Sequence, residues 1–294
     1  MSHPITRRRA LQGLALTGAT ALAFTRGKVS AQEAIAETLK LKGNIRQSVS
    51  YWCFGGIPLG EFTDICKKTG LVGIDLLNPD QWETVTGKGM LVTMGNVPGA
   101  GIDRGFNSLK EHDRLVECYE ATIPKAAKIG VPNLICFSGN RHGLSDEEGL
   151  ENCVKGIRRI LPIAEKHGVT IVLELLNSRV DHHDYQADHT AWAADLVRKT
   201  GSENLKLLYD IYHMQIMEGD LIRTIEHNTD VIGHFHTGGN PGRNEIDDTQ
   251  EIYYPAVMKA ILKTGYKGVV AHEFTPKRDD KLASLRQAVK LCDV

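Results

Sequence analysis

The sequence predicts a closed (β/α)8 TIM barrel, and three observations lead to this fold class. Short apolar runs rich in Val, Ile and Leu alternate with longer amphipathic stretches, the pattern of parallel strands separated by helices. Eight such runs can be counted, the number that a closed parallel barrel needs. Once an unusual N-terminal segment is set aside, about 260 residues remain, a usual size for one such domain.

The predicted strands and helices alternate from residue 47 to residue 291. A glycine ends several amphipathic stretches, as in KIGVPN and KHGVT, where it supplies the left-handed cap that closes a helix. No linker rich in Pro, Ser or Gly divides residues 32–294, which we expect to form a single domain. In chain order, strands are expected at 47–53, 72–77, 90–95, 133–137, 169–175, 205–210, 231–237 and 268–274. The clearest helices are expected at 109–129, 146–167, 187–200 and 279–291.

Residues 1–31 have the pattern of an export signal. Arg7-Arg8-Arg9 precedes an apolar run, and Ala31 ends an A-x-A-like sequence. The arginine pair indicates the twin-arginine route, so we expect a domain exported to the periplasm or another extracytoplasmic space. The alternative is an N-terminus that is disordered or serves as an anchor. The apolar run is too short for a stable membrane span.

Charge and cysteine content narrow the class of protein. Without the first 31 residues the chain has 30 Lys and Arg against 36 Asp and Glu, a formal net charge of −6. An acidic domain is a poor electrostatic partner for nucleic acid, so we expect no such partner. The six cysteines form neither a C-x-x-C pair nor a Cys/His metal spacing, and we expect free thiols in apolar surroundings.

Four side chains of the kind that bind metals stand near the ends of four successive predicted strands. They are Glu174 in IVLELLN, Asp210 in LKLLYDIYH, His236 in IGHFHTGGN and Glu273 in GVVAHEF. Their spacings of 36, 26 and 37 residues are each about the length of one strand-helix unit. The C-terminal ends of barrel strands meet on one face, where active sites are built, so these residues should converge.

Three carboxylates and one imidazole in a single site suit a divalent metal. We expect Mn²⁺ or Mg²⁺, with Co²⁺ or Zn²⁺ as alternatives. Glu174 and Glu273 are also the expected catalytic acid and base, because paired glutamates beside a metal suit proton transfer. His234 shares a strand face with His236, but His236 is the expected ligand since it lies nearer the strand's C-terminal end. For any one carboxylate, the alternative is a structural salt bridge.

Three further residues are candidates for substrate binding. His213 stands at the start of the loop after the sixth predicted strand. Arg243, in a Gly-rich segment after the seventh, offers a charged fork for an acidic or hydroxylated substrate. His112, at the start of a predicted helix, has the least support of the three.

Three loops should lie on the same face as these candidates. The Gly-rich segments 95–105 and 237–245 each follow a predicted strand, and loops at that end of a barrel carry function. The polar segment 181–184 follows Glu174 and holds two histidines and two aspartates. It is read either as part of a loop that covers the substrate or as solvated surface.

Longer runs around these residues resemble the hydroxypyruvate isomerase family. The specific parts are Tyr-Asp-Ile-Tyr-His-Met-Gln at 209–215 and Asn-Pro-Gly-Arg at 240–243. The resemblance is dense over about 170–276 and looser over 45–140. This family belongs to the xylose isomerase-like barrels, together with the ketose 3-epimerases.

The resemblance implies metal-dependent isomerisation of a small hydroxy-carbonyl compound, of the hydroxypyruvate or tartronate semialdehyde type, through an enediol. It implies that Glu174 and Glu273 move protons at neighbouring carbons and bind the metal with Asp210 and His236. Typical hydroxypyruvate isomerases carry Gln at the position of His236, whereas the 3-epimerases carry His. The export signal is a second departure from the hydroxypyruvate isomerases, because hydroxypyruvate is an intracellular metabolite.

Several other functions stay open from the sequence. A ketose 3-epimerase, or a lyase or hydrolase of keto-sugars, would use the same two glutamates. A barrel that cleaves phosphodiesters, of the endonuclease IV type, would need more histidines and a basic groove. A sugar-binding protein without catalysis is the alternative outside the enzymes. The sequence also leaves open whether the chain forms a homo-oligomer.

Overall fold

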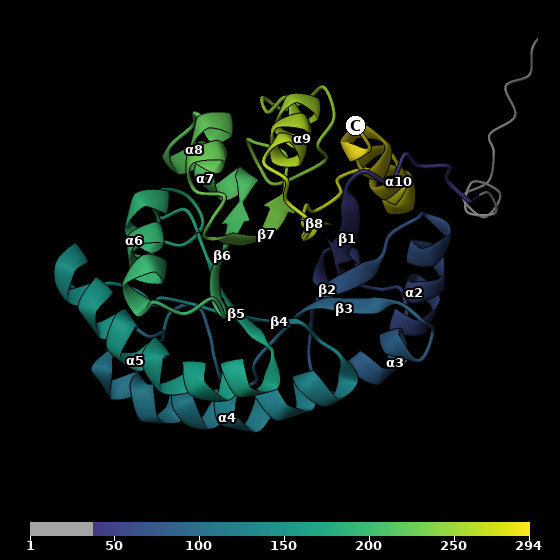
Figure 1. Ribbon diagram of the computed structural model, residues 1–294. Coiled ribbons are helices and arrows are strands. Elements are labelled where there is room, and N and C mark those ends of the chain that lie inside the picture. The colour runs from purple at the N-terminus through teal and green to yellow at the C-terminus, as the bar shows by residue number, and fades with distance from the viewer. Residues whose placement is uncertain (1–37) are drawn as a thin grey trace, which may run out of the picture.

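Eight parallel strands close into a barrel in the computed structural model of the protein, which describes residues 38–294 (Figure 1). Each strand pairs with the next, and β8 closes the ring by pairing with β1. The predicted (β/α)8 barrel is confirmed, while the expected export signal at 1–31 lies outside the described residues. The strands are β1 Arg46–Ser50, β2 Gly73–Leu77, β3 Leu91–Gly95, β4 Asn133–Cys136, β5 Thr170–Glu174, β6 Leu205–Asp210, β7 Ile232–Thr237 and β8 Val269–His272.

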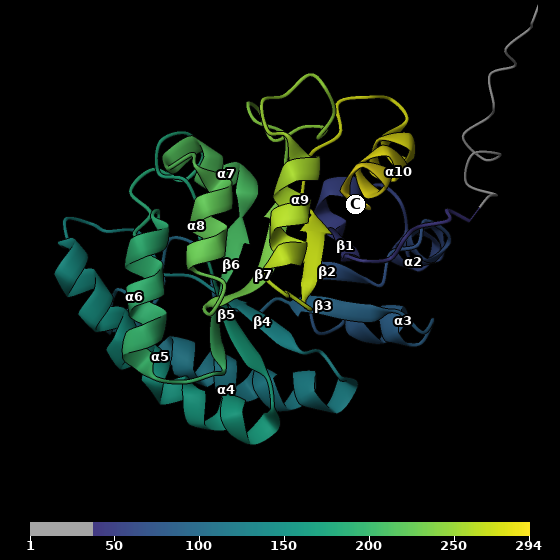
Figure 2. The same cartoon turned by 45° about the horizontal axis from the view of Figure 1, so that its top comes forward.

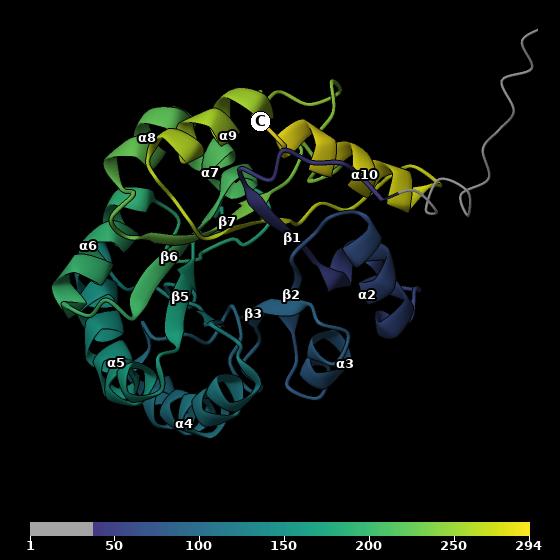
Figure 3. The same cartoon turned by 45° about the vertical axis from the view of Figure 1, so that its right-hand side comes forward.

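Helices connect the strands and form a ring outside the barrel, which can be followed from two further sides in Figure 2 and Figure 3. The two longest helices, α4 and α5, pack side by side. The α-helices are α2 Leu59–Lys68, α3 Trp82–Thr86, α4 His112–Ile129, α5 Asp146–His167, α6 Thr190–Thr200, α7 Ile211–Met217, α8 Leu221–His227, α9 Tyr254–Lys263 and α10 Lys281–Cys292. Two short 3-10 helices are η1 Tyr51–Phe54 and η2 Leu109–Glu111.

Local sequence signals set both ends of α5. The Ser145 hydroxyl accepts a hydrogen bond from the backbone N–H of Glu148, and the Glu148 carboxylate accepts one from the backbone N–H of Ser145. This capping box satisfies two donors that the first turn leaves free. At the other end Gly168 adopts φ +64°, the left-handed conformation that closes a helix. The helix therefore ends at His167, and β5 begins three residues later at Thr170.

The interior of the barrel has an apolar layer below the C-terminal ends of its strands. Met94, Ile135, Val172 and Leu208 form a buried cluster apart from the main core. Because side chains alternate along a strand, Val172 shares its face with Glu174, two residues further on. Leu208 likewise shares its face with Asp210 on β6, so the apolar cluster lies beneath the acidic groups.

The predicted first strand is too long by its last residues. The chain leaves the sheet after Ser50 and turns into η1, so the expectation of a strand at 51–53 is wrong. Apolar residues continue through SYWCF because Cys53 and Phe54 pack into the core from this turn. The turn leaves Trp52 half exposed at the barrel mouth, with its indole Nε1–H bonded to Glu273.

Two further expectations concern membrane-spanning helices and the cysteines. Within residues 38–294, no helix is long and apolar enough to cross a membrane. The six cysteines all fall in this range and are unpaired, and five of them are buried, as the apolar context of Cys53 and Cys136 indicated.

Candidate metal and active site

The four predicted metal-type side chains meet at the C-terminal end of the barrel. Glu174 and Asp210 end β5 and β6, His236 lies one residue before the end of β7, and Glu273 directly follows β8. One potential ligand atom from each lies within 4.8 Å of the other three. Nδ1 of His236 is 2.7 Å from Glu273 Oε2 and 3.3 Å from Glu174 Oε1. The structure therefore brings together residues that are up to 99 positions apart in the sequence.

Two buried atoms of this cluster lack a hydrogen-bond partner. Glu174 Oε1 and His236 Nδ1 are both inaccessible to solvent, and neither makes a hydrogen bond of acceptable geometry. Buried polar atoms without partners are rare and costly in folded proteins. A cation held between these atoms would satisfy both, and three carboxylates with one imidazole suit a divalent ion. The residues present therefore fit a metal of the Mn²⁺, Mg²⁺, Co²⁺ or Zn²⁺ kind.

Asp75, at the centre of β2, fixes the ring of His236. Its Oδ2 lies 3.2 Å from Nε2 of His236 and 2.6 Å from Nε2 of His234, and its Oδ1 accepts from the hydroxyls of Ser48 and Thr93. Burial alone would raise the pKa of Asp75, but the two histidines lower it well below its ordinary value. With Nε2–H donated to this carboxylate, Nδ1 of His236 is the nitrogen that faces the cluster and that would bind a metal after losing its proton, the arrangement typical of metal-binding histidines.

Sequence reasoning missed Asp75, although a signal was present. The residue stands in VGIDLL, a carboxylate within an apolar strand, the same pattern that singled out Glu174 in IVLELL. It lies in the first half of the chain, 99 positions before the first of the four candidates, Glu174. The structure shows that it reaches His234 and His236 across the barrel interior, a contact that spacing along the chain does not reveal.

Arg243 adds a fixed positive charge to the acidic cluster. Its Nη2 lies 2.6 Å from Glu273 Oε2 and 3.3 Å from Asp210 Oδ2. The guanidinium carbon is 5.5 Å from the ring centre of Trp52 and 5.6 Å from that of Tyr212, within cation–π range of both. The backbone at Arg243 has φ +56°, a conformation that non-glycine residues seldom adopt and that often marks functional sites.

Charge within the cluster is unevenly shared between two of its carboxyl groups. Burial raises the pKa of Asp210 to about 7, although Arg243 opposes this shift. Burial also acts to raise the pKa of Glu273, but Arg243 and His236 outweigh it and lower that pKa to about 2. The pKa of His236 is raised well above its usual value because the nearby carboxylates outweigh its burial. The cluster therefore holds protons in its metal-free form that a bound metal would displace.

His213 points one defined nitrogen toward the cluster. Its Nδ1 accepts hydrogen bonds from the backbone N–H and the side-chain amide of Asn177, at 3.1 and 2.6 Å. Burial, and next the charge of Arg243, hold the pKa of His213 well below its usual value, so the ring is neutral. The proton then resides on Nε2, which has no hydrogen-bond partner and lies 3.7 Å from Asp210 Oδ2. This N–H is buried without an acceptor of its own among the described residues, and His213 lines neither of the two cavities at the cluster.

His112, the third expected substrate-binding residue, is not brought together with the others. Its ring is buried at the start of α4, where Nε2 bonds to the backbone oxygen of Phe106 at 2.8 Å. The imidazole also packs against Gly156 of α5, where an added Cβ would lie 2.6 Å from Nε2. His112 therefore holds α4 and α5 together and lines neither cavity at the cluster.

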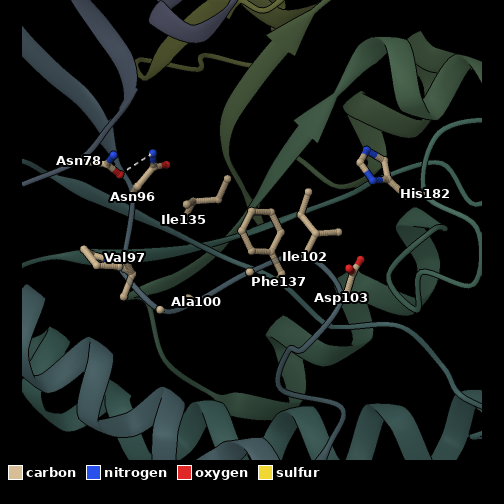
Figure 4. A pocket seen from close by; sticks show the side chains of 12 residues that line it. Asn78, Asn96, Val97, Ala100, Ile102, Asp103, Ile135, Phe137 and His182 are labelled. Atoms are coloured by element: carbon tan, nitrogen blue, oxygen red, sulfur yellow. Dashed lines mark hydrogen bonds between the residues drawn. The ribbon is translucent and has the colours of Figure 1, made fainter.

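Two connected cavities open beside the cluster. The reaction lobe has a volume of about 430 Å³ and is lined by Glu174, Glu273, Arg243 and Trp52 among others. The outer lobe has a volume of about 550 Å³ and is lined mainly by the loop after β3, which contains the Gly-rich segment 95–105 (Figure 4). The two lobes share walls formed by Asn96, Ile102, Ile135, Phe137 and His182. Of the polar segment 181–184, His182 thus belongs to the site.

Comparisons with known proteins show the family of this chain. Residues 54–292 match the protein family described as "Xylose isomerase-like TIM barrel". Hydroxypyruvate isomerase from Escherichia coli (strain K12) is 30% identical over 222 residues, which cover 71% of this chain and 84% of that protein. A putative hydroxypyruvate isomerase from Homo sapiens is 31% identical over 168 residues, which cover 55% of this chain and 61% of that protein.

Solved structures share the fold at lower sequence identity. An AP endonuclease of family 2 from Brucella melitensis superposes with a TM-score of 0.75 and 23% identity, covering 82% of this chain and 97% of that one. A D-psicose 3-epimerase superposes with a TM-score of 0.67 and 16% identity, covering 85% and 94%. At these identities the likeness extends to the fold alone, since this barrel carries many chemistries.

Proposed function

We propose that this chain, which belongs to the xylose isomerase-like TIM barrel family, is a divalent-metal-dependent isomerase of a small hydroxy-carbonyl compound. Relatives named hydroxypyruvate isomerase support an isomerase. The observation that carries the metal dependence is the convergence of Glu174, Asp210, His236 and Glu273 around two buried atoms without partners. Nδ1 of His236 forms ion pairs with Glu273 and Glu174, yet neither it nor Glu174 Oε1 makes a hydrogen bond of acceptable geometry, and a cation between them would complete the site.

The metal, when bound, would supply positive charge beside the carbonyl and hydroxyl oxygens of the substrate. Glu174 and Glu273 line the reaction lobe and are the groups that move the proton. One carboxylate takes the proton from the hydroxyl-bearing carbon next to the carbonyl, which leaves an enediolate with its negative charge on the former carbonyl oxygen. The hydroxyl proton passes to that oxygen, the hydroxyl oxygen becomes the new carbonyl oxygen, and a carboxylic acid returns a proton to the former carbonyl carbon. The electron pair of the broken C–H bond forms the C=C bond of the enediol and then the new C–H bond.

Two residues are placed to stabilise the charge that develops on the substrate oxygen. His213 offers its Nε2–H as a neutral donor, and a neutral imidazole donates without giving up its proton entirely. Arg243 provides a fixed cation between Trp52 and Tyr212 and orients the Glu273 carboxylate. Donors held in place by the fold before the substrate binds are the basis of electrostatic stabilisation.

A ketose 3-epimerase is the second candidate, and His236 is the observation that favours it. The 3-epimerases carry histidine at this position, whereas typical hydroxypyruvate isomerases carry glutamine. The same two glutamates would then act on opposite faces of one carbon, so that the proton returns to the carbon it left. A lyase or hydrolase of keto-sugars would begin with the same proton removal.

The test combines metal binding with proton exchange. Chelator-treated protein is titrated with Mn²⁺, Mg²⁺, Co²⁺ and Zn²⁺ by calorimetry, and the loaded protein is incubated in D2O with hydroxypyruvate, ketoses and 3-keto-sugars. NMR should show deuterium entering one carbon of one substrate class. Glu174→Gln and Glu273→Gln should abolish exchange, while Glu203→Gln, a fully solvated glutamate on the surface, should leave it intact.

The position of the label separates the two candidates. Deuterium on the carbon that becomes newly hydrogenated, with a shifted carbonyl, identifies an isomerase. Deuterium on the original carbon with inverted configuration identifies an epimerase. Metal-loaded protein that exchanges no substrate proton would contradict both and would favour a hydrolase without proton abstraction at carbon.

Export of the domain is a separate proposal that rests on residues 1–31 alone. Replacement of Arg7, Arg8 and Arg9 together by lysine should retain the full-length precursor in the cytoplasm of a bacterial host with a twin-arginine system. Fractionation with antibody detection measures the outcome. If the wild type and the triple-lysine variant were distributed alike between cytoplasm and periplasm, the proposal would be contradicted.

A further inference from the structure

The loop after β3 builds a cavity that the proton-transfer chemistry does not use. Asn96, Ala100, Gly101, Ile102 and Asp103 of this loop line the outer lobe, which opens into the reaction lobe through shared walls. The Glu174, Asp210, His236 and Glu273 cluster borders only the reaction lobe or lies beneath it. A substrate that reacts at the cluster therefore has a second space directly beside it.

The size of the outer lobe exceeds the need of a small substrate. If each heavy atom takes about the 30 Å³ that a water molecule occupies in the liquid, a compound of about seven heavy atoms takes roughly 200 Å³. The reaction lobe of about 430 Å³ already holds such a compound. The outer lobe has a volume of about 550 Å³ by itself, enough for a hexose ring.

The side chains of the outer lobe suit an uncharged, hydroxylated ring. Figure 4 shows Phe137 and Ile102 side by side in the cavity, with Asn78 and Asn96 on one side and His182 on the other. The amide N–H2 of Asn96 donates to Leu76 O and to Asn78 Oδ1, so its own oxygen and the Asn78 amide N–H2 point to no protein partner. An adjacent donor and acceptor over apolar walls match neighbouring hydroxyls on a sugar ring.

Charge in the outer lobe argues against an anionic extension. Among the described residues that line it, none is Lys or Arg, and Asp103 contributes a negative charge. Burial lowers the pKa of His182, so this ring brings no positive charge at neutral pH. A phosphate or carboxylate in the outer lobe would therefore find no counter-ion.

We propose that the outer lobe binds a neutral sugar ring joined to the reacting unit, so that the preferred substrate is a glycosylated keto-sugar. The proposal rests on the proposed function, because it assigns the reacting hydroxy-carbonyl end to the Glu174 and Glu273 site. The cavity volume, the free amide groups of Asn78 and Asn96 and the lack of basic residues carry it.

The experiment compares D-fructose with three glucosyl-fructoses, namely isomaltulose, turanose and leucrose. All four present a ketose to the cluster, and only the disaccharides carry a ring for the outer lobe. Deuterium exchange is measured with the metal-loaded full-length protein, and binding is measured in parallel by saturation-transfer NMR. We expect kcat/KM for at least one disaccharide to exceed that for fructose by about tenfold or more, as a well-packed additional contact provides.

A bulky residue in the outer lobe is the matching variant. Gly101 lines this lobe, its φ lies outside the left-handed region, and an added Cβ would have nothing within 4 Å. Gly101→Phe should reduce kcat/KM for the preferred disaccharide by about tenfold or more and change fructose by less than about twofold. Ala121→Phe places the same bulk on the exposed face of α4 and should leave both substrates unaffected. Asn78→Ala, a smaller change, should reduce disaccharide turnover by about fivefold.

The outcomes separate this proposal from the proposed function. Proton exchange on fructose or hydroxypyruvate without a preference for any disaccharide would overturn the sugar-binding role of the outer lobe and keep the isomerase. The same conclusion would follow if Gly101→Phe reduced exchange on fructose and on the disaccharide equally. Disaccharide binding that Gly101→Phe removes, without any proton exchange, supports the outer lobe and overturns the isomerase. Absence of both exchange and binding overturns both.

Discussion

Nε2 of His236 and Oδ2 of Asp75 lie 3.2 Å apart, so the ring of the metal-type histidine is held from the far side of the barrel interior. His234 contacts the same oxygen at 2.6 Å. One carboxylate thereby sets the orientation of two imidazoles and leaves Nδ1 of His236 facing the acidic cluster. The partner of a metal-binding histidine usually affects affinity by 10–100-fold when it is changed.

Replacing Asp75 by Asn should therefore weaken metal binding by about 10–100-fold. The amide offers one acceptor where the carboxylate offers two, and its N–H2 opposes the N–H groups of the histidines. Calorimetric titration with Mn²⁺ measures the affinity, and circular dichroism checks the fold. Ser48→Ala removes a single hydroxyl donor from Asp75 and should change the affinity by less than about threefold. Wild-type affinity in Asp75→Asn would show that the contact has no role in metal binding.

Trp52→Phe should reduce kcat by about tenfold or more, the effect of losing one hydrogen bond to a charged group. The indole Nε1–H donates to Glu273 Oε1 at 2.6 Å, and phenylalanine keeps an aromatic face for Arg243 while removing this donor. Steady-state kinetics on the substrate found by proton exchange measures the change. Trp192→Phe is the matched control, because its Nε1–H donates to a backbone oxygen at Asp146, away from the cluster. Equal losses in the two variants would contradict a specific role for Trp52.

His213→Leu should lower kcat by about 100-fold, the cost of removing a donor from a developing oxyanion. His213→Gln retains an amide N–H2 and should recover part of this loss. Because burial already keeps the pKa of His213 well below its usual value, the ring stays neutral, and its titration should add no acid limb to the pH profile of kcat in the range where an ordinary histidine titrates. An acid limb that disappears in His213→Gln would mean that the ring acts as a cation.

Glu245→Gln should lower stability at neutral pH, with an effect that fades in acid. The nearly buried carboxylate accepts hydrogen bonds from the backbone N–H groups of Lys277 and Arg278 and from the Ser284 hydroxyl. Although burial alone would raise the pKa of Glu245, these bonds lower it. A lowered folded-state pKa stabilises the fold above the unfolded-state pKa, and this stabilisation is lost as pH falls through the folded value.

Thermal unfolding of wild type and Glu245→Gln from pH 7.5 to pH 3.5 measures this dependence. At pH 7 we expect a difference of about 1–3 kcal/mol in the free energy of unfolding. The two unfolding temperatures should approach each other only as pH falls below the ordinary glutamate pKa of about 4.3, because the wild-type carboxyl of the folded protein gains its proton at a lower pH. A difference that stays constant over the whole range would show that charge at Glu245 does not matter.

The sequence predicted the barrel well because each of its strands is marked locally. Strands buried on both faces read as continuous apolar runs, and the chain repeats this mark eight times. The positions of Glu174, Asp210, His236 and Glu273 at the ends of such runs predicted their convergence, since all parallel strands end on one face. Because the strand-helix units have similar lengths, residues spaced by about one unit along the chain come close together in the barrel.

Contacts made across the barrel escaped the same reasoning. Asp75 reaches His234 and His236 over 159 and 161 positions, and no local pattern records which strands face each other through the interior. For His112, local position alone predicted a substrate contact, whereas the ring packs between helices. A histidine at a helix start after a strand suits the catalytic face, but its ring turns toward α5, where Gly156 leaves room for it.

The acidic cluster and the outer lobe are built by different segments of the chain. Carboxylates and imidazole come from β5 to β8, whereas the outer lobe is built chiefly by the segments that follow β2, β3 and β4. Substitutions at residues 96–103 can therefore alter which molecule the outer lobe accepts while the four side chains of the acidic cluster stay in place. Exchanging residues 96–103 between relatives of this barrel would therefore change substrate specificity and leave the catalytic residues unchanged. A new sugar specificity could then evolve through changes in one loop.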